Sequence, residues 1–259
     1  QPEDGGNAPA AAATRGQRVA ADPADPVSVA ERDRRPGGDQ VIPRPESWSP
    51  GPPPPWALSM DRPLQLGDVV GAVRAHGAPR PIMPAFPDSY LSAVLIALVD
   101  GDEGPEVLLT RRAAHLRNHH GEISFPGGRL DPGETPVDAA IREAHEEVAL
   151  HPAVVEVVGE LDHLNTAVSR SYIVPIVARL AERPSLRPAQ DEVDRIFFVP
   201  LAELRRPDTY REERWGVPPT DRPIHFFELD DETVWGATAR ILAQLLALAH
   251  GTDPPPAWS

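Results

Sequence analysis

One segment, residues 127–150, restricts the fold of this chain more than any other. Two glycines at 127–128 precede a predicted helix from Pro136 to Leu150, with Thr135 as its expected N-cap. Apolar residues recur along one side of that helix, and three glutamates at the i, i+3 and i+4 spacing share another side. The helix must therefore pack on a core while it displays carboxylates. The apolar positions are Val137, Ala140, Ile141, Ala144 and Val148, and the glutamates are Glu143, Glu146 and Glu147.

Three carboxylates on one helical face repel one another unless a cation offsets their charge. Hard divalent cations such as Mg²⁺ take oxygen ligands and combine a few carboxylates with substrate phosphate oxygens. Gly127 and Gly128 would let the backbone approach such a ligand closely. Glu134, near the start of the helix, would orient a site residue or favour the helix dipole. The alternative is an ordinary solvated acidic face.

The rest of the chain alternates predicted strands and helices. A hairpin of two strands, 90–99 and 106–110, precedes the acidic helix. More strands and a closing helix follow it, which predicts a mixed α/β fold with helices packed on a sheet. The other expected elements are a helix at 64–76, strands at 154–161, 172–180, 195–199 and 224–229, a helical turn at 201–204 and the closing helix at 233–249.

Composition excludes several kinds of site and partner. The chain has no Cys, which excludes disulfides and thiol nucleophiles, and no Lys, which excludes Schiff-base chemistry and a Walker-type phosphate loop. A net charge of −14 argues against nucleic acid and anionic membranes as partners. The longest apolar run, 92–99, is too short to span a bilayer, and residues 1–60 hold no apolar signal-peptide core, so we expect a cytoplasmic protein.

The acidic helix and its flanks follow a longer pattern. Gly128 is followed after five residues by Glu134, and after seven more by the sequence REAHEEVAL at 142–150. This spacing resembles the Nudix box, the signature of the Nudix hydrolases, and departs from it at Ala149, where that family has Gly. The resemblance implies an α/β Nudix fold, with a mixed β-sheet sandwiched between α-helices. It also implies metal-assisted hydrolysis of a diphosphate within a nucleotide derivative.

A second pattern lies immediately upstream. Its spacing resembles the motif of the Nudix coenzyme A pyrophosphatases, and the segment 234–239 is similar to the end of that subfamily, so the resemblance covers 85–250. It implies that the substrate is coenzyme A or acyl-coenzyme A and that the products are 3′,5′-ADP and (acyl-)4′-phosphopantetheine. The matching residues are Leu108, Leu109, Thr110, Arg112, Ala113, Arg117, Gly121, Phe125, Pro126, Gly127 and Gly128.

Local charge agrees with a phosphate-bearing substrate. Residues 111–129 contain four Arg and one acid, Glu122, which is a local charge of +3 in a chain of −14. Arg side chains bind phosphates through paired hydrogen bonds, although any one of them could instead form a surface ion pair. The histidines nearby, 115, 119 and 120, lack the spacing of a zinc site. The expected substrate-binding residues are Arg112, Arg117, Gly121, Phe125, Gly127 and Arg129.

The resemblance also implies roles within the site. The cofactor would be Mg²⁺ (or Mn²⁺), with Arg142 orienting a glutamate through a salt bridge and Glu134 in support. The general base stays open: Glu192 and Asp194 are candidates because they precede a late strand, and the acidic run at 191–194 could equally be loop surface. The expected metal ligands are Glu143, Glu146, Glu147 and the Gly128 carbonyl. The expected catalytic residues are Glu143, Glu146, Glu147, Arg142, Glu134 and Glu192.

These assignments divide the chain into parts. Residues 1–60 hold 12 of the 33 prolines, so we expect a disordered tail whose removal leaves activity and thermal stability nearly unchanged. A lead-in helix and linker at 61–84, the Nudix hydrolase domain at 85–250 and a C-terminal tail at 251–259 follow. The oligomeric state stays open.

Two other functions fit the same residues. The box would also serve a pyrophosphatase acting on ADP-ribose, NADH or another nucleoside diphosphate derivative, since only the upstream motif favours coenzyme A. The fold could instead serve a non-catalytic binding module. Such modules usually lose carboxylates of the box, whereas all four of its glutamates are present here, and the tail is neither basic nor helix-turn-helix-like.

Overall fold

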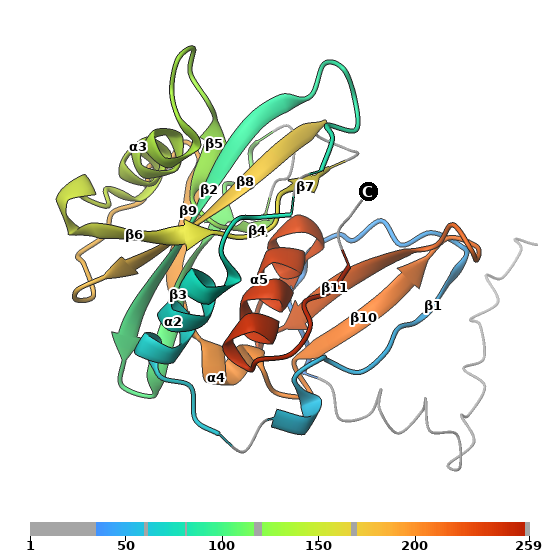
Figure 1. Ribbon diagram of the computed structural model, residues 1–259. Coiled ribbons are helices and arrows are strands. Elements are labelled where there is room, and N and C mark those ends of the chain that lie inside the picture. The colour runs from blue at the N-terminus through green and yellow to red at the C-terminus, as the bar shows by residue number, and fades with distance from the viewer. Residues whose placement is uncertain (1–34, 60–61, 81, 117–120, 167–169, 257–259) are drawn as a thin grey trace, which may run out of the picture. The chain divides into compact units, whose positions relative to one another are not determined.

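A mixed sheet forms the centre of the fold (Figure 1). The computed structural model describes residues 35–59, 62–80, 82–116, 121–166 and 170–256. The long strand β2 (Tyr90–Gly101) runs parallel to β8 (Ser171–Leu180) and antiparallel to β3 (Gly104–Arg112), which confirms the predicted hairpin. The other strands of this sheet are β4 (Ile123–Ser124), β5 (Gly127–Arg129), β6 (Val155–Glu160), β7 (Leu164–Asn165) and β9 (Val193–Pro200).

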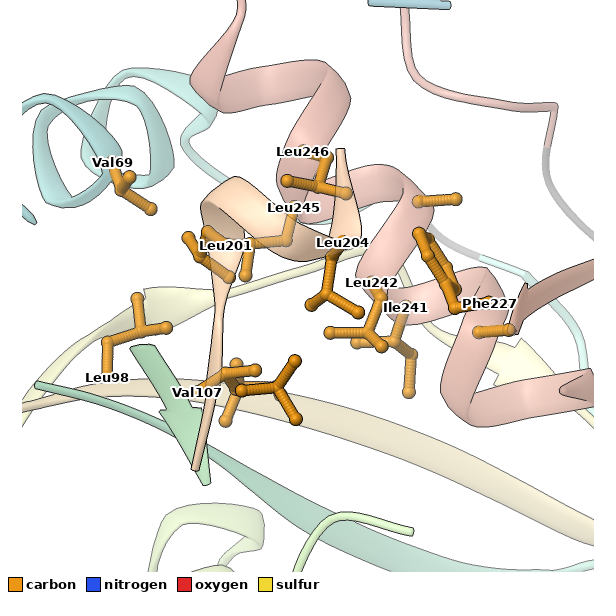
Figure 2. Packing of buried hydrophobic residues seen from close by; sticks show 14 of the residues in the cluster. Val69, Leu98, Val107, Leu201, Leu204, Phe227, Ile241, Leu242, Leu245 and Leu246 are labelled. Carbon is orange, nitrogen blue, oxygen red and sulfur yellow. The ribbon is translucent and has the colours of Figure 1, made fainter. Parts of the chain in front are cut away.

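Helices cover both faces of the mixed sheet. On one face, α3 (Pro136–Val148) packs against Leu95 and Ile176. On the other face, α2 (Leu66–His76), α4 (Leu201–Leu204) and α5 (Gly236–Ala249) share one apolar cluster with Leu98 and Val107 (Figure 2). Because each face is apolar and covered, β2 and β8 are near-continuous apolar runs. The α/β fold with its sheet between helices is therefore confirmed.

A second sheet packs against the other side of α5 (Figure 1). It consists of β1 (Trp48–Pro50), β10 (Tyr210–Trp215), β11 (Arg222–Glu228) and β12 (Thr233–Trp235) in that order. Phe227 and Val234 of this sheet join the cluster that α5 shares with the mixed sheet. Helix α5 is buried on nearly all sides from Ala239 to Ala247, as expected for a helix that is apolar all around. Two short 3₁₀ turns complete the described elements, η1 (Ala57–Ser59) and η2 (Pro152–Val154).

The expected tails at both ends of the chain need correction. The boundary at residue 60 is wrong for 35–59, because β1 pairs with β10 and Trp56 is fully buried. The C-terminal boundary at 250 is also wrong, because Pro255 is buried and its carbonyl accepts a hydrogen bond from Arg240 Nη2 at 2.7 Å. The expectation for residues 1–34 and 257–259 lies outside the described residues. Among the described residues, no helix has the length and apolar character needed to cross a membrane.

Several expected elements also differ in extent. The closing helix begins at Gly236 rather than at 233, because Thr233–Trp235 pair with β11 as β12. Strand β10 was not predicted, and β9 begins at Val193. The acidic helix ends at Val148, and Thr135 caps its start by accepting a hydrogen bond from the Asp138 N–H.

Ala149, the one departure from the Nudix pattern, ends α3 in a left-handed conformation with φ of 57°. Only Gly adopts this region without a steric cost, which is about 1 kcal/mol for other residues. We therefore expect Ala149→Gly to raise the free energy of unfolding by about 0.5–1 kcal/mol, and the thermal midpoint by about 1–4 °C. Calorimetry would measure both.

The matched control is Ala153→Gly. This residue is also exposed, but its φ is not positive, so Gly there adds only chain entropy to the unfolded state. We expect the control to lower stability by about 0.5–1 kcal/mol. If both variants lower it equally, the left-handed end of α3 carries no strain.

Candidate active site

Helix α3 brings its acidic side close to strand β5. Three of its buried residues are alanines, which lets the helix axis approach the sheet closely. The helix contacts both β2 and β5, so its glutamates lie beside the backbone of Gly127–Arg129. The buried residues of α3 are Ala139, Ala140, Ala144, Glu147 and Val148.

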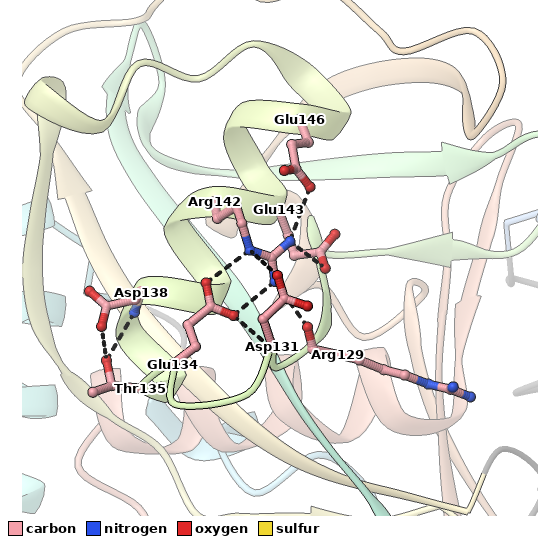
Figure 3. A network of polar contacts seen from close by, with 8 residues as sticks. All are labelled: Arg129, Asp131, Glu134, Thr135, Asp138, Arg142, Glu143 and Glu146. Carbon is pink, nitrogen blue, oxygen red and sulfur yellow. Dashed lines mark hydrogen bonds and ion pairs between the residues drawn. The ribbon is translucent and has the colours of Figure 1, made fainter.

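Arg142 is the centre of the polar network at this site (Figure 3). Its Nε and Nη2 donate to the two oxygens of Glu134 at 2.8 and 2.9 Å, and its Nη1 donates to Glu143 and to Glu146 at 3.0 Å. Nη2 also donates to the carbonyl oxygen of Arg129 at 3.0 Å. The paired bonds with Glu134 raise the pKa of Arg142 and lower the pKa of Glu134. The expected salt bridges of Arg142 are confirmed.

Glu147 is the buried carboxyl of the site. Its side chain is 4% exposed, and its Oε2 accepts a hydrogen bond from the Gly127 N–H at 3.2 Å. Burial raises its pKa to about 8, although the Gly127 N–H and the nearby charge of Arg112 oppose that rise. The guanidinium of Arg112 lies 3.8 Å from Glu147 Oε1. A further positive charge at this point would favour the ionised form.

Glu143 lies between Arg142 and the glycines of β5. A Cβ atom added at Gly128 would collide with the Glu143 carboxylate, so only Gly allows this approach. Burial raises the pKa of Glu143 against the bond from Arg142, and the negative charges of Glu146 and Glu192 add to the rise. The carboxylates are therefore close enough to repel one another, as the sequence suggested.

Glu192 reaches the site from the loop before β9. Its carbonyl accepts a hydrogen bond from the Ala113 N–H at 2.8 Å, and the Ala189 N–H bonds the Glu147 carbonyl at 2.8 Å. This loop is thus fastened to both β3 and the end of α3. The Glu192 side chain is exposed, and its charge raises the pKa of both Glu143 and Glu147. Asp194, the other candidate base, accepts a hydrogen bond from the Ala114 N–H at 3.0 Å.

Comparison with known proteins places this arrangement in a family. Residues 89–219 match the NUDIX domain. This chain belongs to the NUDIX domain family. The uncharacterised Nudix hydrolase NudL of Enterobacter sp. (strain 638) is 37% identical over 167 residues, covering 63% of this chain and 84% of that protein. Nudix hydrolase 3 of Caenorhabditis elegans is 38% identical over 138 residues, 52% of this chain and 57% of that protein. The crystal structure of the M. smegmatis Nudix hydrolase RenU has a TM-score of 0.39 at 24% identity, covering 44% of this chain and 73% of that one.

As a Nudix hydrolase, the protein is an enzyme that hydrolyses diphosphate bonds of nucleoside diphosphate derivatives. Nudix hydrolases generally use divalent metal ions, and the oxygen donors of α3 and the backbone of β5 are of the type that such ions prefer. Within the described residues, no group of three His, Asp or Glu side chains already converges on a metal position. Glu143 and Glu146 bond Arg142 instead.

The expected substrate-binding residues lie in different places. Arg112 points toward Glu147 and is 29% exposed, so it can reach a ligand at the carboxylates. The Arg129 side chain points away from them, and its guanidinium lies 3.6 Å above the ring of Tyr90 (Figure 3). Gly127 donates to Glu147, and Gly121 adopts a φ of 70° at the end of the loop that follows β3. Arg117, His119 and His120 lie outside the described residues.

Phe125 requires a correction. Its side chain is 2% exposed and belongs to the apolar cluster beneath α5. The expectation that it binds substrate is therefore wrong for its side chain, which fills the core. The motif containing it includes residues that support the site as well as residues that face it.

Sequence reasoning missed two residues beside the site. Asp131 Oδ2 lies 3.9 Å from Arg142 Nε, and its N–H donates to Glu134 at 2.9 Å. Tyr90 supports Arg129 from the first position of β2. The alternation of β-strand side chains could have found Tyr90, because Ser92 pairs with Arg129 and Tyr90 shares a face with Ser92.

Proposed function

We propose that this protein hydrolyses the diphosphate bond of coenzyme A or acyl-coenzyme A, giving 3′,5′-ADP and (acyl-)4′-phosphopantetheine. The observation that carries the proposal is the position of Arg112, a fixed residue of the upstream motif, 3.8 Å from the buried carboxyl of Glu147. Arg112 and the last two residues of the motif, Gly127 and Gly128, thus all lie beside the carboxylates. A substrate with several phosphates suits this combination of Arg and carboxylates.

The carboxylates of Glu143, Glu146 and Glu147 and the carbonyl of Gly128 would hold Mg²⁺ or Mn²⁺. When bound, such an ion supplies positive charge that neutralises the diphosphate oxygens. Arg142 keeps Glu143 and Glu146 in place, and Glu134 keeps Arg142 in place.

The reaction adds water across one phosphoanhydride. The oxygen of water forms a bond to one phosphorus, the bridging P–O bond breaks, and the departing phosphate keeps the bridging oxygen. We assign Glu192 as the base that accepts the proton of water, since its carboxylate is exposed and close enough to influence Glu143 and Glu147. Arg112 binds a phosphate of the substrate.

Product analysis by mass tests the substrate directly. The purified protein would be incubated with Mg²⁺ and, in separate reactions, coenzyme A, ADP-ribose and NADH. We expect 3′,5′-ADP and 4′-phosphopantetheine to form faster than the products of the other two substrates. The matched variant is Arg112→Ala, which should raise the KM for coenzyme A more than the KM for ADP-ribose.

The other outcomes separate the alternatives. Cleavage of ADP-ribose or NADH alone would overturn the assignment of coenzyme A and leave the enzyme class intact. Binding of metal without cleavage of any of the three would favour a non-catalytic binding module.

A further inference from the structure

A buried carboxylate outside the matched family region holds the start of the loop between β3 and β4 (the motif loop), of which residues 113–116 and 121–122 are described. Glu232, just before β12, is 1% exposed. Its Oε1 accepts hydrogen bonds from Arg111 at 3.0 Å and from Arg195 at 2.9 Å. Arg111 and Arg195 are paired neighbours on β3 and β9. The Glu232 carboxylate therefore binds both strands at the point where the loop leaves the sheet.

Gln40 holds the other end of the same loop. Its Nε2 donates to Glu232 Oε2 at 2.6 Å and to the Gly121 carbonyl at 3.2 Å, while its Oε1 accepts from the Thr233 N–H at 2.9 Å. The Thr233 N–H can only donate, so it fixes which end of the amide faces Gly121. Gly121 in turn closes the loop, because its N–H donates to the Arg112 carbonyl at 3.0 Å.

Two glycines allow the segment 37–40 to lie directly against Glu232. A Cβ atom at Gly38 would lie 2.7 Å from the Cα of Glu232, which real Cβ atoms do not show. The Gly38 N–H donates to Thr233 Oγ1 at 3.0 Å, and the Gly37 N–H donates to the Leu229 carbonyl at 3.0 Å. The segment 37–40 is therefore fastened to the turn that carries Glu232.

Arg112, the last residue of β3, lies where the motif loop begins and faces the carboxylates. Arg111 and Arg112 are consecutive in β3, so their side chains point to opposite faces of the strand. The register between β3 and β9 also shifts here, because Asp194 of β9 is an extra residue between the partners of Arg111 and Arg112. Arg111 bonds Glu232, and Arg112 lies beside Glu147 of α3. Bulges of this kind redirect side chains next to active sites.

We propose that Gln40 and Glu232 form a clamp that positions Arg112, at the point where the motif loop leaves β3, for binding of the substrate phosphates. Both residues lie outside the NUDIX match at 89–219, so the flanking segments take part in substrate binding without touching substrate. This inference rests on the proposed function for its substrate, and on the hydrogen bonds of the clamp for its mechanism. Gln40 and Glu232 are therefore positioning residues.

The test replaces Gln40 with Ala and follows coenzyme A hydrolysis with Mg²⁺. We expect the KM to rise about 10-fold while kcat stays within about threefold, because a displaced Arg112 weakens binding of the substrate phosphates rather than the chemistry at α3. Gln244→Ala is the control, since Gln244 is also a hydrogen-bonded Gln, on α5, and its side chain contacts His76 rather than the loop. It should leave KM unchanged.

A double variant separates positioning from general loss of stability. If Gln40 acts through Arg112, then Gln40→Ala should raise KM little further in a chain that already carries Arg112→Ala. The clamp would be overturned if the KM increase of the double variant equalled the product of the two single increases. It would also be overturned if Gln40→Ala and Gln244→Ala had the same KM.

Hydrogen exchange tests the clamp without relying on catalysis. In the metal-free protein, Gln40→Ala should speed exchange at the amides of Gly121 and Arg112, whereas Gln244→Ala should not. If the wild-type protein does not cleave coenzyme A, the proposed function fails, and the exchange rates alone decide the clamp. Unchanged exchange at Gly121 in Gln40→Ala would overturn it.

Discussion

Replacing Glu147 with Gln is expected to lower the turnover number at least about 100-fold, because the amide removes a charge that would hold the metal at the diphosphate. The Gln side chain keeps the size of Glu and can still accept the Gly127 N–H. Loss of activity would therefore report the missing charge rather than a cavity. The turnover number is measured with saturating Mg²⁺ and substrate.

The same variant should change how stability depends on pH in the metal-free protein. Burial raises the pKa of Glu147 from its ordinary value of 4.5 to about 8. The protonated carboxyl therefore stabilises the folded state, fully below pH 4.5, and this contribution is lost as the pH rises toward 8. Each pKa unit corresponds to about 1.4 kcal/mol. The Gln side chain of Glu147→Gln stays neutral at every pH. The free energy of unfolding of this variant should therefore not decrease in the same way between pH 4.5 and about 8.

Glu146→Gln is the matched control on the same helix. Its side chain is 57% exposed, so we expect a comparable loss of turnover but the wild-type dependence of stability on pH. Guanidinium unfolding in the presence of a chelator, at about pH 5, 6.5 and 8, distinguishes the two variants. A turnover within threefold of wild type would remove Glu147 from the metal ligands. Parallel stability profiles for the wild type and Glu147→Gln would show that burial does not raise its pKa.

The central part of the fold could be predicted because its local patterns agree with its tertiary environment. Helix α3 has a capping Thr, a Pro in the first turn and one apolar stripe, and β2 is a long apolar run. Each element buries the surface that its own sequence marks as apolar. The spacing of the glutamates likewise predicted that Glu143 and Glu146 share one side of the helix, and both bond Arg142 there.

Strand β10 of the second sheet could not be predicted, because it buries charged side chains. Strand β10 reads Tyr-Arg-Glu-Glu-Arg-Trp, which shows no apolar alternation. Arg211 and Glu213 are both buried and bond each other, and Arg211 also pairs with Glu228 at 2.9 Å. Buried charges of this kind are tolerated only when they are paired. Their other partners, Glu228 of β11 and Arg44, are distant in the sequence. The local sequence of β10 therefore resembles a polar loop.

Long-range contacts explain the other failures of sequence reasoning. Glu232 and Gln40 are separated by almost the whole folded chain but share one hydrogen bond. The prediction that Phe125 binds substrate was wrong for a different reason. The spacing of a motif does not distinguish a side chain that faces the ligand from one that fills the core. Burial decides between the two, and Phe125 is buried in a cluster whose members lie far apart in the sequence.

Replacing Trp56 with Ala is expected to lower the free energy of unfolding by about 3–5 kcal/mol. Trp56 lies in the proline-rich segment that composition alone predicted to be disordered, but it is 0% exposed. Its ring contacts Tyr210 edge-on at 4.9 Å and stacks on Phe227 at 6.3 Å between centroids. Its Nε1 donates to the Arg205 carbonyl at 2.9 Å, which satisfies the only polar atom of the side chain.

Trp48→Ala provides the control within the same segment. Trp48 is 38% exposed and lies on the short strand β1, with the guanidinium of Arg44 4.2 Å above its ring. We expect it to cost less than about 1 kcal/mol, as for most substitutions of partly exposed residues. Denaturant unfolding compares the two variants with the wild type. If Trp56→Ala were as mild as Trp48→Ala, residues 35–59 would not be part of the core. The expected difference would instead show that Trp56 joins this segment to the core formed by Tyr210 and Phe227.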